Sequence, residues 1–504
     1  MGDEGVQFPL IDGQRSTQRT SRDVFAHAAA VVDADLATSI RAEGRWRTAY
    51  PIYLRRLTER AAVSPAAGVA VARTGLDRIQ ATFEFLDHGT ARPLADAMAS
   101  PSGDALTTRT VTGDGTGSDR LVVPYRGARL HDEDLLQTAR DWQHRGVVEP
   151  AVVTALTRLV EHPDWLDLAG AWLAVLGAGA EMAPTESLLA WGADVVAVDV
   201  PRPQVWQRLE DMAARGTGRM HMPVDHASGP PGIDLIAGAP RVRAWLETFD
   251  HPLVLGNYAY ADGATFARVS VAADAVIAAL QRGRDDLSVV CLATPTDTFA
   301  VPAEVVRQTR ERAGPVSATQ PIPTRRGFLS LTLTLAGAVN RATAGRLLVP
   351  SYRQTVRTDA GDELGIADSL VVQQGPNYAL AKRMQRWRAL VSHATGAFGA
   401  VHVAPPTRTR SVLKNRVLAA AYAGAPMFGI ETFEPATSRT LMAALLVHDL
   451  RMHGQGTARA GPAAEHELTA AAVHGGLWRL PWEPRTALPL AVLRGAPALL
   501  RRAR

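Results

Sequence analysis

Apolar runs alternate with amphipathic segments in the middle of this chain. One apolar run, Leu173 to Leu176, is followed by a glycine turn, and a second, Val195 to Val198, ends at Asp199. Between them, apolar residues at helical spacing occupy positions 182 to 189. This order predicts a strand, a tight turn, a helix and a second strand.

Two further apolar runs, Pro252 to Gly256 and Leu287 to Ala293, enclose an amphipathic segment from Ala264 to Gln281. Another helix is predicted to begin at Asn377 by its periodicity. Strands that alternate with helices favour the α/β class, with a doubly wound parallel sheet of Rossmann-like type. Ligands of such sheets bind beyond the carboxyl ends of the strands.

The chain has 504 residues, too many for one compact core, so several regions are expected. A helical N-terminal domain and a helical C-terminal extension flank a Rossmann-like catalytic domain that contains an insertion. Within the insertion, alternating leucines from Leu329 to Leu335 are typical of a strand. The predicted regions are a disordered N-terminus (1–20), the helical N-terminal domain (21–165), the catalytic domain (166–430), its insertion (303–370) and the extension with its basic tail (431–504).

Composition limits the class of protein. Apolar residues make up 46% of the chain and charged residues 21%, as in ordinary globular proteins. The single cysteine, Cys291, excludes an internal disulfide and is expected of a reducing compartment such as the cytoplasm. No apolar run reaches about 18 residues, so no membrane-spanning helix is predicted, and the N-terminus lacks a secretory pattern. The histidines are too irregularly spaced to predict a metal site.

The net charge of +4 is spread over scattered arginines, which argues against a nucleic-acid partner. The C-terminal tail, LAVLRGAPALLRRAR, is both apolar and basic, which is typical of a contact with a membrane surface or a partner, and also of a frayed amphipathic end. Of 54 basic residues only Lys382 and Lys414 are lysines. Lysine retained among arginines indicates a need for a compact ammonium, with chance retention as the alternative. Lys414 would then bind a cofactor phosphate or an acidic substrate group. The alternative is a lysine on a helix surface without such a role.

The glycine turn has the parts of a dinucleotide site. Gly177 and Gly179 let a backbone approach a pyrophosphate, a helix N-terminus supplies N–H groups, and Asp199, twenty-two residues after Gly177, is placed to bind ribose hydroxyls. The carboxylate favours NAD(H), because it repels a 2′-phosphate, while nearby Arg202 keeps NADP(H) as an alternative.

The loop differs from the dinucleotide fingerprint at the next positions. A third glycine would fall at Met182, or at Glu181 and Ala183 in a variant of the loop, and none is present. Two other interpretations therefore stay open. One is an ordinary βαβ unit whose glycines only turn the chain, and the other is a methyltransferase, although Val175 stands where an acid is usual.

A second constellation lies on the helix that begins near Asn377. Tyr378 and Lys382 are four residues apart, so their side chains share one face of the helix. An adjacent ammonium stabilises a phenolate and lowers the tyrosine pKa from about 10. The pair therefore indicates a tyrosine acid/base, with a half-buried tyrosine beside a solvated lysine as the alternative.

With these residues the stretch from Leu173 to Thr409 resembles the short-chain dehydrogenase/reductase family. The resemblance rests on Gly177 and Gly179, Asn257 after a middle strand, a hydroxyl at Thr294 or Thr296, Tyr378-x-x-x-Lys382, and the strand and proline turn of AVHVAPPTRT.

The resemblance implies roles for these residues. Tyr378 would be the general acid/base, Lys382 its activator and a clamp on ribose, and a hydroxyl would polarise the substrate carbonyl. Gly365 stands at the position of the family serine, so Thr294 or Ser351 would replace it. In the proline turn, Pro405 and Thr407 would approach the nicotinamide carboxamide.

We therefore expect an NAD(P)-dependent oxidoreductase that reduces a carbonyl or oxidises an alcohol of a largely apolar small molecule. The alternatives are an S-adenosylmethionine-dependent methyltransferase and a non-catalytic nucleotide-sensing protein, and the sequence leaves an oligomer open. The expected catalytic residues are Tyr378, Lys382, Thr294 and Asn257. The expected cofactor-binding residues are Gly177, Gly179, Glu181, Met182, Asp199, Arg202, Asn257, Thr294, Lys382, Pro405 and Thr407.

Overall fold

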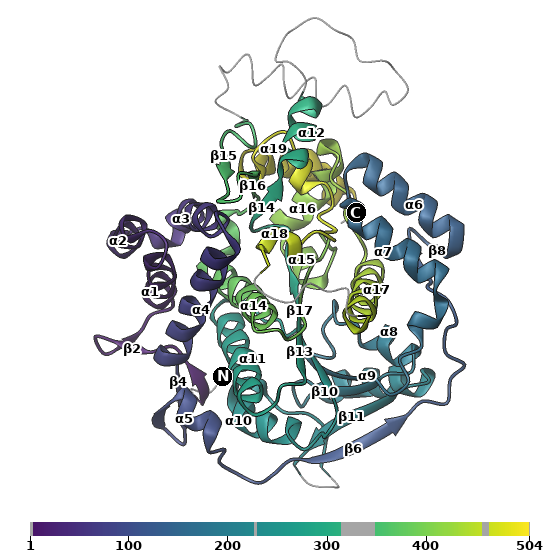
Figure 1. Ribbon diagram of the computed structural model, residues 1–504. Coiled ribbons are helices and arrows are strands. Elements are labelled where there is room, and N and C mark those ends of the chain that lie inside the picture. The colour runs from purple at the N-terminus through teal and green to yellow at the C-terminus, as the bar shows by residue number, and fades with distance from the viewer. Residues whose placement is uncertain (1–3, 226–228, 314–347, 456–462, 503–504) are drawn as a thin grey trace, which may run out of the picture.

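A computed structural model describes residues 4–225, 229–313, 348–455 and 463–502 (Figure 1). Its centre is a seven-stranded sheet with six parallel strands and one antiparallel edge strand. Counted along the chain, the parallel strands lie in the order sixth, fifth, fourth, first, second, third. Across the sheet the strands are β17 (Gly399–Val403), β13 (Leu287–Ala293), β12 (Leu253–Asn257), β9 (Trp172–Leu176), β10 (Asp194–Val198), β11 (Arg219–Val224) and the antiparallel β6 (Thr107–Thr112).

Helices cover both faces of this sheet, which is why its strands are apolar throughout. Leu173 and Val175 of β9 enter one hydrophobic core, whereas Ala174 and Leu176 enter the other. The prediction of an α/β fold around a mostly parallel sheet is confirmed. The helices on one face are α10 (Leu235–Leu246), α11 (Gly263–Gly283) and α14 (Pro376–Ala394), and on the other α6 (Asp132–Arg145), α7 (Pro150–Glu161), α8 (Thr185–Ala190), α9 (Pro203–Arg215) and α17 (Pro435–Gly454).

The order of the strands reverses between β9 and β12. From β9 the chain continues to β10 on one side, while β12 lies on the other side of β9. In open parallel sheets a crevice forms at such a point, outside the carboxyl ends of the strands. Gly177 comes directly after β9 there and Asn257 ends β12.

The N-terminal residues are ordered, so the prediction of a disordered segment over 1–20 is wrong from Glu4 on. β1 (Gly5–Gln7) pairs with β4 (Glu84–Asp87), and Val6 and Phe8 are buried. Sequence-local reasoning misses this segment because its pairing partner lies about 80 residues away. Also in this part are β2 (Leu10–Ile11), β3 (Gln14–Arg15) and β5 (Thr90–Pro93).

The N-terminal helices share one hydrophobic core with the sheet rather than having a core of their own. In Figure 1 they form the purple group beside α14, and α4 packs directly on α14. Their bounds are α1 (Thr17–Ala30), α2 (Ala34–Ala42), α3 (Trp46–Ala61), α4 (Pro65–Thr82) and α5 (Leu94–Ala99). A small hairpin, β7 (Val123–Tyr125) and β8 (Ala128–Leu130), precedes α6, and η1 (Pro163–Leu166) precedes β9.

The region expected to be an insertion begins in a second, antiparallel sheet. It contains β14 (Thr298–Pro302), β16 (Glu363–Asp368) and β15 (Thr355–Arg357), with α12 (Ala303–Ala313) packed against it. The strand predicted over Leu329 to Leu335 lies outside the described residues. After this sheet come η2 (Val372–Gln374), α14 and β17.

The C-terminal part is mostly helical. Its elements besides α17 are α15 (Arg410–Lys414), α16 (Arg416–Gly424), η3 (Ala425–Phe428), α18 (Glu465–Leu468), η4 (Leu477–Arg479) and α19 (Pro484–Arg502). Among the described residues, α11 is the one helix long and apolar enough to span a membrane, but 72% of its apolar window is buried inside the protein. It packs between α10, α14 and the sheet, as the core helix of a folded domain does.

Candidate functional site

Tyr378 and Lys382 lie on the face of α14 that packs on α11. The Tyr378 and Phe266 rings are 5.5 Å apart between centroids, and Lys382 Nζ lies 5.7 Å from the same Phe266 ring. α14 can begin at Pro376 because proline suits the first turn of a helix, and Gly375 before it has a φ of 83°. The expected shared face is therefore present, next to the carboxyl end of β13.

A chain of hydrogen bonds leads to the hydroxyl of Tyr378. Gln374 Nε2 donates to Thr296 Oγ1 at 2.8 Å, Thr296 and Thr294 share a hydrogen bond of 2.8 Å, and the Thr294 hydroxyl lies near enough to Tyr378 to affect its pKa. Val371 N–H donates to Gln374 Oε1, which fixes the amide with its nitrogen toward Thr296. In the pair of threonines either hydroxyl can donate to the other, and Thr294 Oγ1 also accepts the Thr296 N–H.

Burial raises the pKa of Tyr378, and the Thr294 hydroxyl counteracts this rise because its hydrogen bond favours the phenolate. The sequence predicted instead that Lys382 lowers this pKa. The Lys382 ammonium points elsewhere: it donates to the Leu292 carbonyl at 2.9 Å and to Gln385 Oε1 at 3.1 Å. In this structure the side chain that lowers the pKa of Tyr378 is therefore Thr294 and not Lys382.

Lys382 is itself perturbed by its surroundings. Burial lowers its pKa to about 8, although the neighbouring Cys291 and Asp297 act in the opposite direction. Asp297 has closer partners, since its carboxylate pairs with Arg383 at 2.9 Å and with Arg386 at 2.8 Å. Asp297 lies after β13 as expected, but it is a buried structural ion pair that joins α14 to β14.

Asn257 lies in the interior between the sheet and α11, near Gln385, which bonds Lys382. It is 4% exposed and lines a cavity of about 10 Å³ together with Ser270 and Gln385. Asn257 Oδ1, Ser270 Oγ and Gln385 Nε2 have no hydrogen-bond partner among the described residues. A space of this size with three polar groups suits a single water molecule. Gln385 therefore connects Lys382 to the cavity that Asn257 faces.

The segment that follows the glycine turn differs from the prediction. Gly177 has a φ of 83°, and a Cβ there would lie 2.6 Å from the Ala259 backbone, so glycine is required. However, the next helix, α8, has only six residues and begins at Thr185. Met182 lies in the turn before it and packs against the core on that face of the sheet. A helix follows the glycine turn as predicted, but it begins later than the predicted segment, because the chain first makes two successive turns, Gly177 to Ala180 and Ala180 to Ala183.

The N–H groups of this turn are used within the protein. Gly177 and Ala178 donate to the Val198 carbonyl, Ala180 donates to the Gly177 carbonyl, and Gly179 donates to Asp199 Oδ2 at 2.7 Å. A pyrophosphate would therefore not find free N–H groups at these four positions.

Asp199 lies at the carboxyl end of β10 as predicted. Burial raises its pKa, whereas the N–H groups of Gly179 and Val200 act in the opposite direction. Each carboxylate oxygen accepts one backbone N–H and can accept another donor, so two ribose hydroxyls fit its remaining capacity. Arg202, at the start of α9, is exposed.

The other predicted cofactor contacts lie farther along the same edge of the sheet. Glu181 accepts the Arg410 N–H at 2.9 Å and so joins the turn to α15. Thr407 is buried, and its hydroxyl donates to the Pro405 carbonyl and bonds Ser438. Thr407 is thus satisfied inside the protein.

Of the two candidates for the missing serine, Thr294 is the hydroxyl beside Tyr378. Ser351 lies against the C-terminal segment, where its N–H donates to the Pro481 carbonyl.

Two more tyrosines lie near Tyr378. Tyr260 and Tyr422 are both close enough to influence its pKa, and the Tyr260 ring also packs on Phe266. Tyr260 is 50% exposed, and its hydroxyl bonds Asp262 and the hydroxyl of Ser411 on α15. No sequence pattern indicated Tyr422 or Phe266, because each joins the site from a distant segment. Gln374 lies only four residues before Tyr378, and its part in the site becomes visible only through its bond to Thr296.

A larger depression, about 580 Å³, lies elsewhere, between α6 and α12. It is lined by Arg140, Gln143, His144, Pro150, Gln308, Glu311, Arg312 and Arg479, and by none of the predicted site residues. Among the described residues no three His, Cys, Asp or Glu side chains are grouped to hold a metal ion.

No model of a known protein family matches the chain, and no curated protein is significantly similar to it.

Proposed function

We propose that the protein is an NAD(P)(H)-dependent oxidoreductase with a Rossmann-like nucleotide-binding sheet, acting on a largely apolar carbonyl or alcohol in the cytoplasm. The main support is the position of Tyr378 beside the hydrogen-bonded residues Thr294, Thr296 and Gln374 at the carboxyl edge of the sheet. The strand order supports it, because the same order occurs in doubly wound dinucleotide-binding sheets.

Tyr378 is the proton donor in this proposal. Burial keeps its hydroxyl protonated at neutral pH, so the proton for a carbonyl oxygen is present. The raised pKa makes the phenol a weaker acid, and stabilisation of the phenolate in the transition state must offset this. The resulting phenolate would accept the Thr294 hydrogen bond, which gains strength as the charge develops. The nicotinamide, when bound, supplies or accepts the hydride.

Asp199 would hold the ribose of the cofactor through its two free acceptor positions. Lys382, whose Nζ donates to the Leu292 carbonyl at the end of β13, would bind the nicotinamide ribose of the cofactor. The Asp199 carboxylate is the reason to expect NAD(H) rather than NADP(H), whereas the exposed Arg202 favours NADP(H).

One observation favours a second candidate. The N–H groups of residues 177–180 are used internally, and a nucleoside without a pyrophosphate makes no demand on them. S-adenosylmethionine is such a ligand, so a methyltransferase is the alternative function.

Nucleotide titration separates the two functions. Trp206 is buried, and its indole N–H donates to the Val200 carbonyl directly after Asp199, so its fluorescence reports on a ligand at this strand end. We expect NADH or NADPH to change the emission saturably, and Asp199→Ala to weaken that binding about tenfold or more. Binding of S-adenosylmethionine alone would replace the dehydrogenase proposal by the methyltransferase, and binding of none of the three would refute both.

A further inference from the structure

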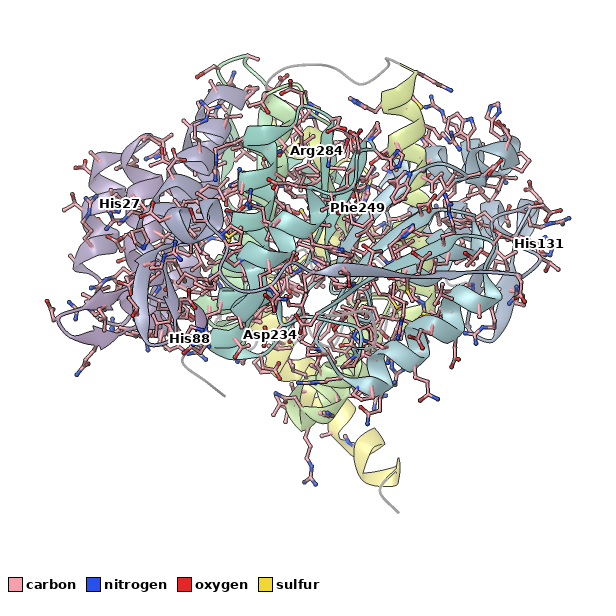
Figure 2. All side chains as sticks on the ribbon, turned by 90° about the horizontal axis from the view of Figure 1, so that it is seen from below. His27, His88, His131, Asp234, Phe249 and Arg284 are labelled. Carbon is pink, nitrogen blue, oxygen red and sulfur yellow. The ribbon has the colours of Figure 1, made fainter. Side chains whose placement is uncertain are left out.

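α16 and α19 form a tightly packed helix pair near the candidate site. A Cβ on Gly424 would lie 1.9 Å from the Ala491 carbonyl oxygen, and one on Gly495 would lie 1.9 Å from the Ala420 carbonyl oxygen. The two helices are antiparallel, because Gly424 late in α16 meets Ala491, whereas Ala420 earlier in α16 meets Gly495. The beginning of α16 therefore lies beside the last turns of α19. Figure 2 shows the yellow end of α19 projecting from the body of the protein.

The exposed part of this pair is apolar. Leu413 on α15 is 46% exposed, Val417 on α16 is 54% exposed, and Leu493 on α19 is 71% exposed. Leu493 is the most exposed of the large apolar side chains that the structure describes. Exposed apolar side chains that gather on a projecting element indicate contact with an apolar phase or partner.

Each of these apolar residues has a basic neighbour: Lys414, Arg416 and Arg494. None of the three has a carboxylate within salt-bridge distance in the described part of the chain. The charge of the two segments is one-sided, because residues 407–430 hold four basic residues and no acid, and residues 484–502 hold four more and no acid.

We propose that this projecting helix pair, with residues 413–417 at the start of α16 and with Leu493 and Arg494 on the side of α19 away from α16, binds an anionic lipid bilayer. Apolar side chains beside unpaired cations match the acyl boundary and the phosphate layer of such a membrane. A polyanion such as nucleic acid would match the cations but would leave three large apolar side chains in water.

The same element adjoins the candidate site. Arg410 at the start of α15 donates its N–H to Glu181, Ser411 bonds Tyr260, and Tyr422 on α16 lies near Tyr378. Membrane binding through these helices would therefore bring the lipid surface toward the half-exposed Tyr260. On the basis of the proposed oxidoreductase function, we infer that the substrate is a lipid-soluble carbonyl or alcohol taken from the bilayer.

The experiment is co-sedimentation of the full chain with vesicles of phosphatidylcholine alone or with about 30 mol% phosphatidylglycerol, at about 0.1 M salt. The wild type is expected to sediment with the anionic vesicles. Lys414→Gln, Arg416→Gln and Arg494→Gln are each expected to weaken binding about fivefold, and Leu413→Gln/Val417→Gln/Leu493→Gln to abolish it. The matched control Leu10→Gln/Val31→Gln/Ile52→Gln replaces equally exposed apolar residues elsewhere and should bind normally.

Three results would overturn the proposal: no sedimentation of the wild type, equal loss in the control variant, or undiminished binding by both sets of surface variants. A dimer in solution that the apolar variant alone disrupts would assign the surface to a second copy of the chain. Preferential binding of a single-stranded oligonucleotide would assign it to nucleic acid. Either of these two results would contradict the proposal that the surface binds a membrane. Nucleotide titration of the same variants shows separately whether the proposed oxidoreductase function fails.

Discussion

At the scale of single residues, the site depends on which way hydrogen bonds point. Desolvation disfavours the ionised form of the partly buried Tyr378 and raises its pKa, and the Thr294 hydroxyl opposes that effect. Sequence reasoning found Tyr378 by its four-residue spacing to Lys382 and Thr294 by its place after a strand. It assigned the activation to Lys382, because the spacing predicts a shared helix face but not the direction of a flexible ammonium.

Thr294→Val is expected to slow carbonyl reduction roughly 10- to 100-fold, because it removes one hydrogen bond to a developing charge, worth about 1.5–3 kcal/mol. The measurement is steady-state kinetics, and KM should change little. Gln374→Glu, which exchanges the terminal donor for an acceptor, should slow the reaction in the same direction. Unchanged turnover in both variants would show that the chain is only structural.

Lys382 makes the stability depend on pH. Its pKa is about 8 in the folded protein and 10.5 when unperturbed, so the unfolded chain binds more protons between these values. The stability of the wild type relative to Lys382→Met should therefore rise between pH 8 and 10.5, by up to about 3 kcal/mol. Urea unfolding at several pH values measures this. Lys414→Met, at the exposed second lysine, is the control, and a similar rise there would contradict the explanation.

At the scale of elements, local periodicity predicted the sheet well. The strand over Leu287–Ala293 matches its predicted bounds, and α11 extends the predicted helix by a residue or two at each end. The features that it missed depend on contacts between distant segments. β1 is ordered because it pairs with β4, and the turn after Gly177 bonds to two distant residues, Asp199 and Arg410.

The packing of α16 on α19 is the tightest helix contact near the site. Gly495→Ala would place a methyl group against the Ala420 backbone, which cannot move aside, so we expect a loss of about 2 kcal/mol or more. Thermal unfolding and proteolysis of the C-terminal helix measure the effect. Gly454→Ala is the control, because a Cβ there meets nothing within 4 Å. Equal effects at both positions would argue against the close crossing.

At the scale of the whole molecule, buried ion pairs tie the C-terminal part to the helices on the sheet. Glu149, before α7, bonds His474 Nε2 at 2.8 Å and also pairs with Arg479 of η4. Burial opposes the ionisation of Glu149, but these two partners outweigh it and lower its pKa to about 2. Neither partner was predictable, since each lies more than 300 residues away in the sequence.

The pKa of Glu149 is lower in the folded protein than its usual 4.5, so its contribution to stability is present above pH 4.5 and is lost as the pH falls toward 2. Glu149→Gln should cost about 3 kcal/mol at about pH 7 and much less near pH 3. Urea unfolding at the two pH values tests this. If Glu149→Gln lost the same stability at both pH values, the loss would come from packing rather than from charge.

The central claim is that Tyr378 transfers the proton in a hydride-transfer reaction. The most direct measurement compares NADH or NADPH oxidation by the wild type and by Tyr378→Phe over a panel of apolar aldehydes and ketones, with cofactor binding measured in parallel. We predict that the phenylalanine variant binds the cofactor normally and loses a factor of about 10² to 10⁴ in turnover. Full turnover by Tyr378→Phe on a substrate that the wild type reduces would contradict the account.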